Sequence, residues 1–440
     1  MTTFTHRIKS PLLVPLAVSL LLALTLSVSA RDAVQSDSAQ PPAAQSASTT
    51  AQTTPPQHGI VCTTAEADTP TFNLKTADGN IDTPDGNTVY MWGYTLVTED
   101  FQIPGPVLCV NEGDEVTINL TNNLDEPVSI VFPGQTGVEA TGGLEGLLTR
   151  EAPAGGMVSY RFTAMNPGTY LYESGTNPHK QIEMGLYGAL IVRPEMGPNY
   201  AYNDPATEFA PDREYLLLMH DIDMHLHLAV ELGYSYDVTT REHDEYWTLN
   251  GRSLPDTVAP NFAGSLPNQP YGALLVVEPY DETENPLPAL LRFANAGLEN
   301  HPFHPHGNNV KIVAQDGRRL QGPSGEDLTY QAFTKSFGSG QTYDALITWE
   351  DVDGWATQGV TLPVDIPGLQ NLFFTGSTWW SGAAALAEEG ELPVGVTSFN
   401  ECGEYYFPWH SHALNEFQNF DEGFGGLATL WRVNPPGGCP

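Results

Sequence analysis

Short stretches in which polar and apolar residues alternate recur along the chain, and they constrain the fold more than any other feature. The run 115–121 (EVTINLT) alternates strictly, as expected of a strand with one buried face. Turn-forming segments, 104–106 (PGP) and 112–114 (EGD), interrupt the strands before it. Short strands separated by such turns are typical of sandwiches and barrels. We therefore predict an all-β fold.

The strand pattern divides into two units with a Pro-, Asn- and Tyr-rich link between them. Further strands are predicted at 157–162, 168–172 and 188–192, then at 214–221, 246–251, 272–277, 289–293, 310–314, 343–349, 404–409 and 426–433. A short helix is predicted at 381–389. Segments 116–122 and 289–295 echo one another, because each is a strand that ends at Asn a short distance before the next strand. Two copies of one β-sandwich are the simplest interpretation.

The N-terminus carries an export signal. Arg7 and Lys9 precede an apolar run, 11–28, that ends in the small residues Val28, Ser29 and Ala30. This pattern predicts a signal peptide at 1–30, with a single membrane anchor as the alternative. Residues 31–58 are Ala, Gln, Ser, Thr and Pro with few large apolar side chains, which predicts a disordered tether. We expect a periplasmic or extracellular protein with no membrane span after cleavage.

The chain is strongly acidic, with 53 acidic residues against 17 basic ones and a formal charge of −36. Nucleic-acid binding requires a basic surface, so nucleic acid is excluded as a partner. A highly charged surface fits a protein that stays soluble in a salty exterior.

Four cysteines in an exported chain suggest two disulfides. Three pairings exist, and we favour Cys62–Cys109 with Cys402–Cys439 because each pair lies near one end of the chain. None of the four lies beside the paired histidines described next.

Two His-x-His pairs are the main candidates for chemistry. Successive side chains of a strand point to opposite faces, so His304 and His306 share one face, and so do His410 and His412. On neighbouring strands the pairs would gather four imidazoles, which suit copper, zinc, iron and nickel. A lone pair could arise by chance on a surface strand. Two pairs in one unit favour a metal site.

A third pair, His225 and His227, lies among Asp221, Asp223 and Met224. We interpret it as a polar strand end, with a secondary copper site that includes the Met224 thioether as the alternative.

Several motifs together resemble the multicopper oxidase family, whose members are built from cupredoxin β-sandwiches. The motifs are 104–106, 112–114, 181–190, 248–252, 301–307 and 425–427, and the resemblance covers about 59–435. It implies two cupredoxin-like Greek-key β-sandwich domains at 59–195 and 213–440, joined by a linker at 196–212.

The resemblance implies a blue-copper site and a three-copper cluster, but two ligands of the blue-copper site are replaced in this sequence. His301 occupies a blue-copper position, and His304 and His306 occupy cluster positions. In the last motif of the family, His-Cys-His, the thiolate binds blue copper. Ser411 replaces that cysteine, and Glu416 stands where a further blue-site histidine belongs. A hydroxyl is not a thiolate, so we expect no blue copper, and His301 could hydrogen-bond to Glu416 instead.

The first unit lacks its share of the cluster ligands. The family's two pairs there should fall near 131–133 and at 173–175, and neither segment contains histidine. Glu173 is the one carboxylate that this wall could offer. His179, four residues beyond Gly175, is interpreted as a surface residue.

We therefore expect a partial copper site, with zinc as the alternative metal, formed by His304, His306, His410 and His412 and supplemented by His301 and Glu173. If the protein is an enzyme, it would be a copper-dependent oxidoreductase but not a normal laccase. The alternative is a metal-free scaffold or partner-binding module of the cell envelope. Two-domain members of the family assemble as trimers, so a homotrimer is also considered.

Overall fold

The computed structural model describes residues 55–65, 68–237, 244–350, 372–375, 388–391, 405–420 and 425–434. These residues belong to the compact unit Thr54–Pro440. The predicted signal peptide, most of the predicted tether, Cys402 and Cys439 lie outside the described residues.

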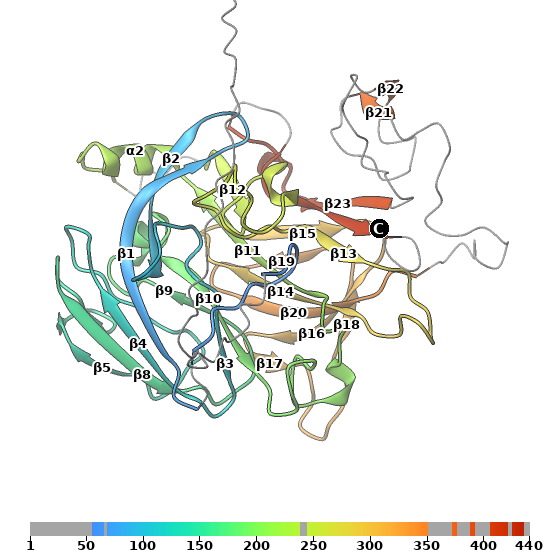
Figure 1. Cartoon of the computed structure of the whole chain (residues 1–440), viewed down its shortest axis with the longest axis horizontal. Coiled ribbons are helices and arrows are strands. Elements are labelled where there is room, and N and C mark those ends of the chain that lie inside the picture. Colours follow the sequence, from blue (N-terminus) through green and yellow to red (C-terminus); the bar gives the residue numbers. More distant parts are fainter. Residues whose placement is uncertain are drawn as a thin grey trace, which may run out of the picture. The chain divides into compact units, whose positions relative to one another are not determined.

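Two sheets built from residues 71–193 form a first sandwich (Figure 1). One sheet has the order β2 (Thr88–Leu96), β1 (Thr71–Asp82), β4 (Glu115–Thr121), β8 (Met157–Thr163) and β5 (Glu139–Gly142). The other has the order β3 (Leu108–Asn111), β10 (Tyr187–Arg193) and β9 (Gly168–Glu173), and β6 (Leu144–Glu145) pairs with β7 (Arg150–Glu151). The alternation in β4 is confirmed, because Val116, Ile118 and Leu120 are fully buried in the core between the sheets.

Two sheets built from residues 214–433 form a second sandwich. One contains β12 (Tyr246–Leu249), β11 (Glu214–Ile222), β14 (Ala289–Asn295), β20 (Thr342–Ile347), β16 (Val310–Gln315) and β17 (Arg318–Arg319) in this order, with β18 (Tyr330–Ala332) also pairing with β16. The other has the order β13 (Leu275–Val277), β24 (Ala428–Val433), β23 (Tyr405–Ser411), β15 (His301–Pro305) and β19 (Lys335–Phe337). A separate pair joins β21 (Leu372–Thr375) to β22 (Glu388–Glu391). The predicted all-β class is therefore confirmed, while the predicted domain boundaries stay a prediction.

The two sandwiches share their strand pairing. In the first, β1 runs parallel to β4, β3 runs parallel to β10, and β10 pairs antiparallel with β9. In the second, β11 runs parallel to β14, β13 runs parallel to β24, and β24 pairs antiparallel with β23. The echo between 116–122 and 289–295 falls on the equivalent strands β4 and β14, as two copies of one sandwich require.

The asparagines that end these two strands make the same hydrogen bonds. Asn122 donates through Nδ2 to the carbonyl of Glu126 at 2.7 Å and accepts at Oδ1 from the amide of Leu124 at 2.9 Å. Asn295 donates to the carbonyl of Glu299 at 2.7 Å and accepts from the amide of Gly297 at 2.9 Å. Each asparagine thus closes the same local turn before the next strand.

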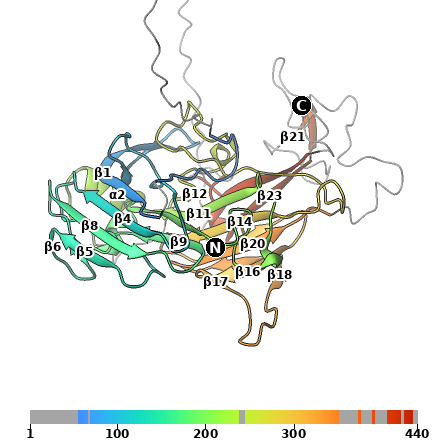
Figure 2. The same cartoon turned by 60° about the horizontal axis from the view of Figure 1, so that its bottom comes forward.

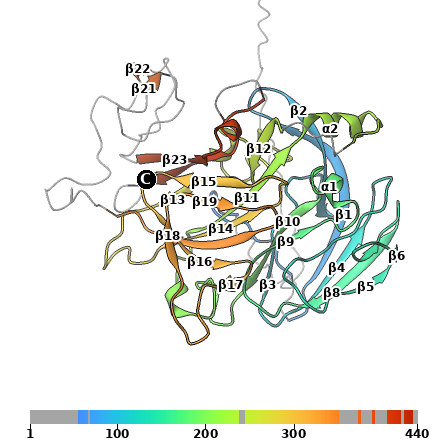
Figure 3. The same cartoon turned by 180° about the vertical axis from the view of Figure 1, so that it is seen from behind.

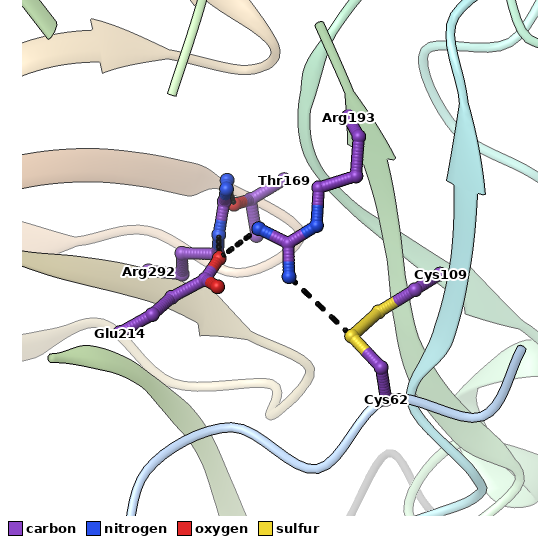
Figure 4. Close-up of a disulfide and its surroundings, with 6 residues drawn as sticks. All are labelled: Cys62, Cys109, Thr169, Arg193, Glu214 and Arg292. Atoms are coloured by element: carbon purple, nitrogen blue, oxygen red, sulfur yellow. Dashed lines mark hydrogen bonds and ion pairs between the residues drawn. A yellow bond between two sulfur atoms is a disulfide. The ribbon is translucent and has the colours of Figure 1, made fainter. Parts of the chain in front are cut away.

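A buried polar network joins the sandwiches at β9 and β10 (Figure 4). Glu214 of β11 accepts from Arg193 and from Arg292, each at 2.5 Å, and Arg292 also donates to Thr169 at 3.1 Å. Figures 2 and 3 show β9 close to β14 and β20 of the second sandwich. Two guanidinium groups hold the pKa of the buried Glu214 carboxyl below its usual value, against the effect of burial. Because the charges are paired, they can be accommodated in the interior.

The disulfide predicted between Cys62 and Cys109 is present, with its Cα atoms 5.5 Å apart. It lies beside the network, since Arg193 also approaches Sγ of Cys62 at 3.4 Å (Figure 4).

The helices were the weakest part of the sequence prediction. The structure contains α1 (Pro178–Gln181), α2 (Met224–Glu231) and the 3₁₀ turns η1 (Pro205–Thr207), η3 (Asp256–Val258) and η6 (Leu414–Glu416). His225 and His227 lie in α2, not at a strand end, because Asp223 accepts hydrogen bonds from two first-turn amides and starts a helix. The helix predicted at 381–389 is wrong at 388 and 389, which belong to β22, and 381–387 lie outside the described residues. No helix within the described ranges has both the length and the apolarity to cross a membrane.

Candidate metal centre

The two predicted His-x-His pairs meet on adjacent strands. Strand β15 pairs antiparallel with β23 (Figure 3). In this register His304 lies directly opposite His410. Nε2 of His306 lies 3.2 Å from Nε2 of His410. The ring centroid of His304 lies 4.8 Å from that of His306 and 5.1 Å from that of His412. We call these four side chains, His304, His306, His410 and His412, the imidazole quartet.

Strand alternation explains why the quartet faces away from the core. Phe303 and Trp409 point to the opposite face, where both are buried and their ring centroids lie 6.4 Å apart. His304, His306 and His410 are half-buried, whereas His412 is exposed. The quartet therefore forms a partly sheltered, solvent-accessible group of rings over a packed apolar layer.

Hydrogen bonds orient two of the rings. Nδ1 of His410 lies 2.7 Å from the carbonyl oxygen of Ser411, so Nδ1 donates and Nε2 keeps its lone pair. Nδ1 of His304 lies 2.7 Å from the hydroxyl of Thr334. Such contacts at the second ring nitrogen are the usual way in which a protein fixes a metal-binding imidazole.

Three rings of the quartet are shifted toward their neutral form. Burial lowers the pKa of His304, His306 and His410, and nearby imidazoles lower it further. The pKa of His306 falls to about 4, first through burial and then through the other three rings. Metal ions bind the neutral imidazole, so these shifts favour ligation at neutral pH.

One pair of the quartet has the spacing of two ligands on a single transition-metal ion, whereas the groups of three described residues with donor atoms within 4.8 Å of one another do not include the quartet. Two ligands at about 2.0–2.1 Å from one tetrahedral ion lie roughly 3.3 Å apart. The 3.2 Å separation between the Nε2 atoms of His306 and His410 matches that spacing. Without an ion, one of these nitrogens must carry a proton to make the contact favourable. The same gap can thus hold either a proton or a metal.

His301 lies in a different environment from the quartet. It is fully buried on the core-facing side of β15. Its Nδ1 lies 2.9 Å from Oε2 of Glu416, and its Nε2 lies 3.4 Å from Oδ1 of Asp221. Burial opposes protonation, but the two carboxylates outweigh it and raise the pKa of His301 to about 9. The proposed hydrogen bond to Glu416 is confirmed, whereas sequence reasoning did not pair His301 with Asp221.

Ser411 lies opposite Phe303, on the side of β23 that faces away from the quartet. Its side chain is buried, and its hydroxyl accepts from the amide of Ala413 at 3.2 Å. This buried hydroxyl cannot supply the charged sulfur ligand of a blue-copper site.

Glu173 occupies the place in the first sandwich that His410 occupies in the second. Glu173 and Val131 exchange backbone hydrogen bonds of 3.1 and 2.8 Å, in the same relation as His410 and His304. Burial raises the pKa of Glu173 to about 7. Within the described part of the chain, no hydrogen bond or ion pair joins Glu173 to the quartet.

Two groups of three potential ligands, neither of which includes a histidine of the quartet, were not assembled by sequence reasoning. Donor atoms lie within 4.8 Å of one another in the group Glu183, Asp221 and Asp244 and in the group Asp223, His225 and Glu245. The short spacing of Asp221, Asp223 and His225 was visible in the sequence. Their partners Glu183, Asp244 and Glu245 come from distant or differently folded segments, so no local motif could identify the groups.

Comparisons with known proteins agree with this architecture. The multicopper oxidase family model matches residues 82–197. A putative laccase, laccase-17 of Oryza sativa subsp. japonica, is 27% identical over 271 residues, which are 59% of this chain and 42% of that protein. A copper resistance protein A homologue of Pseudomonas syringae pv. tomato is 32% identical over 127 residues, 29% of this chain and 20% of that protein. The matched regions thus span less than half of these relatives.

Solved structures show the same fold. A blue copper oxidase from Nitrosomonas europaea superposes with a TM-score of 0.55 at 20% identity, over 82% of this chain and 85% of that chain. A copper nitrite reductase from Nitrosomonas europaea gives a TM-score of 0.50 at 19% identity, over 83% and 94%.

Two β-sandwiches with the same strand pairing define the class as a two-sandwich cupredoxin protein. Its cupredoxin fold is like that of multicopper oxidases, and residues 82–197 match the model of that family.

Proposed function

We propose that this protein is an exported copper-binding protein whose imidazole quartet holds one ion, and that it lacks the blue-copper electron entry of its family. The observation that carries the proposal is the 3.2 Å approach of the Nε2 atoms of His306 and His410 between directly paired strands. Copper at this position would supply one-electron chemistry. Zinc is the competing metal, since both ions accept neutral imidazole.

The protein's own residues limit which chemistry the ion could support. The quartet supplies nitrogen ligands, and the backbone of Ser411 orients one of them. The place of the blue-site ligands is taken by a buried histidine held between two carboxylates and by a buried hydroxyl. Any oxidoreductase activity must therefore receive electrons at the quartet itself, which distinguishes the protein from a laccase.

Metal content tests this proposal directly. We expect mature protein, loaded with Cu(II) and then dialysed, to retain about one equivalent by elemental analysis and to show no intense blue thiolate band. The double variant His306→Ala/His410→Ala should retain almost none. The control His179→Ala removes one exposed histidine elsewhere and should bind as the wild type does. Retention below about a tenth of an equivalent by the wild type would reject the proposal.

A metal-free scaffold is the second candidate. It is favoured by one observation, the filling of the blue site by His301 and its carboxylates. The same experiment separates the two functions. If the quartet variant keeps the metal content and the melting temperature of the wild type, the scaffold is the better description.

Assembly and export complete the proposal. We infer a homotrimer from the family resemblance, in which a neighbouring subunit could present its Glu173 side to the quartet. Light scattering of copper-loaded protein tests this, since a monomer would remove that arrangement. Export rests on the N-terminal pattern at 1–30, and N-terminal sequencing of protein recovered outside the cytoplasm would identify the cleavage site.

A further inference from the structure

Helix α2 and strand β2 line an open cavity that contains none of the imidazole quartet. The helix follows β11 of the second sandwich, yet it lies against β2 of the first (Figures 1 and 3). His227 of the helix contacts the carbonyl oxygen of Tyr90 at 2.6 Å, and Leu226 packs into the core of the first sandwich. The cavity has a volume of about 710 Å³, within the usual range of small-molecule sites.

The wall of this cavity combines negative charge with aromatic rings. Its charged side chains are Asp78, Asp125, Glu126, Glu231, Asp237 and a single lysine, Lys180. Tyr90, Trp92, Tyr234 and Tyr236 supply the rings. Carboxylates repel an anionic ligand, and a wall this rich in charged groups disfavours an apolar one. Aromatic faces attract cations through their negative quadrupole. The wall therefore selects for a positively charged organic molecule.

The chain's own ammonium group shows how the wall receives such a charge. Nζ of Lys180 lies 4.8 Å from the ring centroid of Trp92 and 2.6 Å from Oε2 of Glu126. One ammonium is thus held between an aromatic face and a carboxylate. Asp78 and Glu231 lie on the same wall, so a second ammonium can be received there without displacing Lys180.

Tyr90 connects the aromatic and acidic parts of the wall. Its hydroxyl donates to Asp78 at 3.1 Å and accepts from Nε1 of Trp92 at 3.2 Å. Burial raises the pKa of Tyr90, and the nearby carboxylates of Asp78 and Glu231 add to the effect. The phenol stays neutral, so the negative charge of the wall remains on the carboxylates.

The end of α2 places a ring at the cavity edge. Gly233 has φ +69° and donates to the carbonyl oxygen of Val230, which ends the helix in a left-handed turn. Tyr234 follows at once and is 70% exposed. An exposed tyrosine on a ligand wall can close over a guest without reorganising the core.

We propose that the cavity beneath α2 binds an organic ammonium cation, with linear aliphatic polyamines as the ligand class. One ammonium would lie between Asp78 and Glu231, with the alkyl chain along Tyr90 and Tyr234. This binding is independent of the metal proposed at the quartet.

Calorimetry with full-length mature protein and spermidine tests the inference. The titration is run in 0.15 M NaCl, where the Debye length is about 8 Å and diffuse attraction by the acidic surface is largely screened. We expect saturable binding of one equivalent, and no heat of binding with 1,4-butanediol or glucose. Metal-free and copper-loaded protein should behave alike.

Variants of the lining residues test whether the measured binding heat comes from this cavity. Asp78→Asn/Glu231→Gln and, separately, Tyr234→Ala should each weaken spermidine binding about tenfold. Glu282→Gln changes an exposed carboxylate elsewhere and should leave affinity unchanged. Asp78, Glu231 and Tyr234 are exposed, so the variants should melt as the wild type does. Equal affinity in all variants, absence of binding, or binding of glucose in place of spermidine would overturn the proposal.

Discussion

The two sandwiches share one plan of strand pairing but carry different chemistry at equivalent places. In the second, His304 lies opposite His410, and both belong to the imidazole quartet. In the first, the equivalent pair is Val131 and Glu173. Strand pairing therefore supplies the geometry of a candidate centre in both halves, whereas side-chain identity decides that only one half can offer several imidazoles. The comparison separates what the fold provides from what the individual residues provide.

The largest expected effect concerns the buried charges of the second sandwich. His301→Ala leaves Asp221 and Glu416 without their shared cation, and breaking a buried pair in this way costs about 3–5 kcal/mol. Urea denaturation measures the loss. The control His179→Ala removes an exposed ring of the first sandwich and should change stability by less than about 0.5 kcal/mol. If His301→Ala lowers stability as little as the control does, the charges of His301, Asp221 and Glu416 are not coupled.

The contribution of His301 should also depend on pH. Its pKa is raised from 6.5 to about 9, so the stabilisation is fully present below pH 6.5 and is lost as the pH rises through 9. The difference in unfolding free energy between the wild type and His301→Gln should therefore shrink between pH 6 and pH 10. A difference that grows with pH would contradict the assignment.

The disulfide of the first sandwich should give the next largest effect. Cys62 and Cys109 are 47 residues apart, and chain entropy predicts a loss of about 4 kcal/mol for Cys62→Ser/Cys109→Ser, with about 2–4 kcal/mol typical in practice. Because the disulfide lies in the first sandwich, copper retention by folded protein should not change. Loss of copper from a variant that is still folded would show that the two sandwiches are coupled.

The paired asparagines test the structural repeat itself. Asn122→Ala and Asn295→Ala each remove a donor to buried carbonyl groups, and each should cost about 1–3 kcal/mol. We expect the two losses to agree within about 1 kcal/mol, with exposed Asn73→Ala as a near-neutral control. A large effect at only one asparagine would mean that the turns are equivalent in shape but not in energy.

The smallest effect is expected at Glu173, the counterpart of His410. Burial raises its pKa from 4.5 to about 7, so the folded state keeps the proton that the unfolded state releases, and stability falls as the pH rises through this interval. Glu173→Gln should stabilise the protein at pH 8 by on the order of 1 kcal/mol after allowance for partial solvent screening, and by nothing near pH 4. Glu139→Gln, at an exposed carboxylate, should have no effect at either pH.

Much of the fold was accessible from local sequence pattern. The alternation of β4 identified a half-buried strand, and its terminal asparagine marked the repeat that Asn295 completes. His304 and His306 are two residues apart on a strand, so both rings could be placed on one face from the sequence. Side-chain alternation along a strand is a local property of the backbone.

Features that depend on distant partners could not be predicted in the same way. Asp221 reaches His301 from a strand 80 positions earlier, and no local pattern joins them. The helical turn at His225 required recognising Asp223 as an N-cap within a segment that reads equally well as a strand end. The cavity beneath α2 depends on a segment crossing to the other sandwich, which spacing cannot reveal.

Strand β15 is five residues long, and its successive side chains point either into the buried core, where His301 lies, or toward the solvent-accessible face that carries His304. A one-residue slip against β23 would turn His301 outward and drive His304 into the apolar interior. Insertions or deletions in the preceding turn should therefore be far more damaging than most point substitutions. The length of that turn, as much as any histidine, is what natural variation in this lineage would have to preserve.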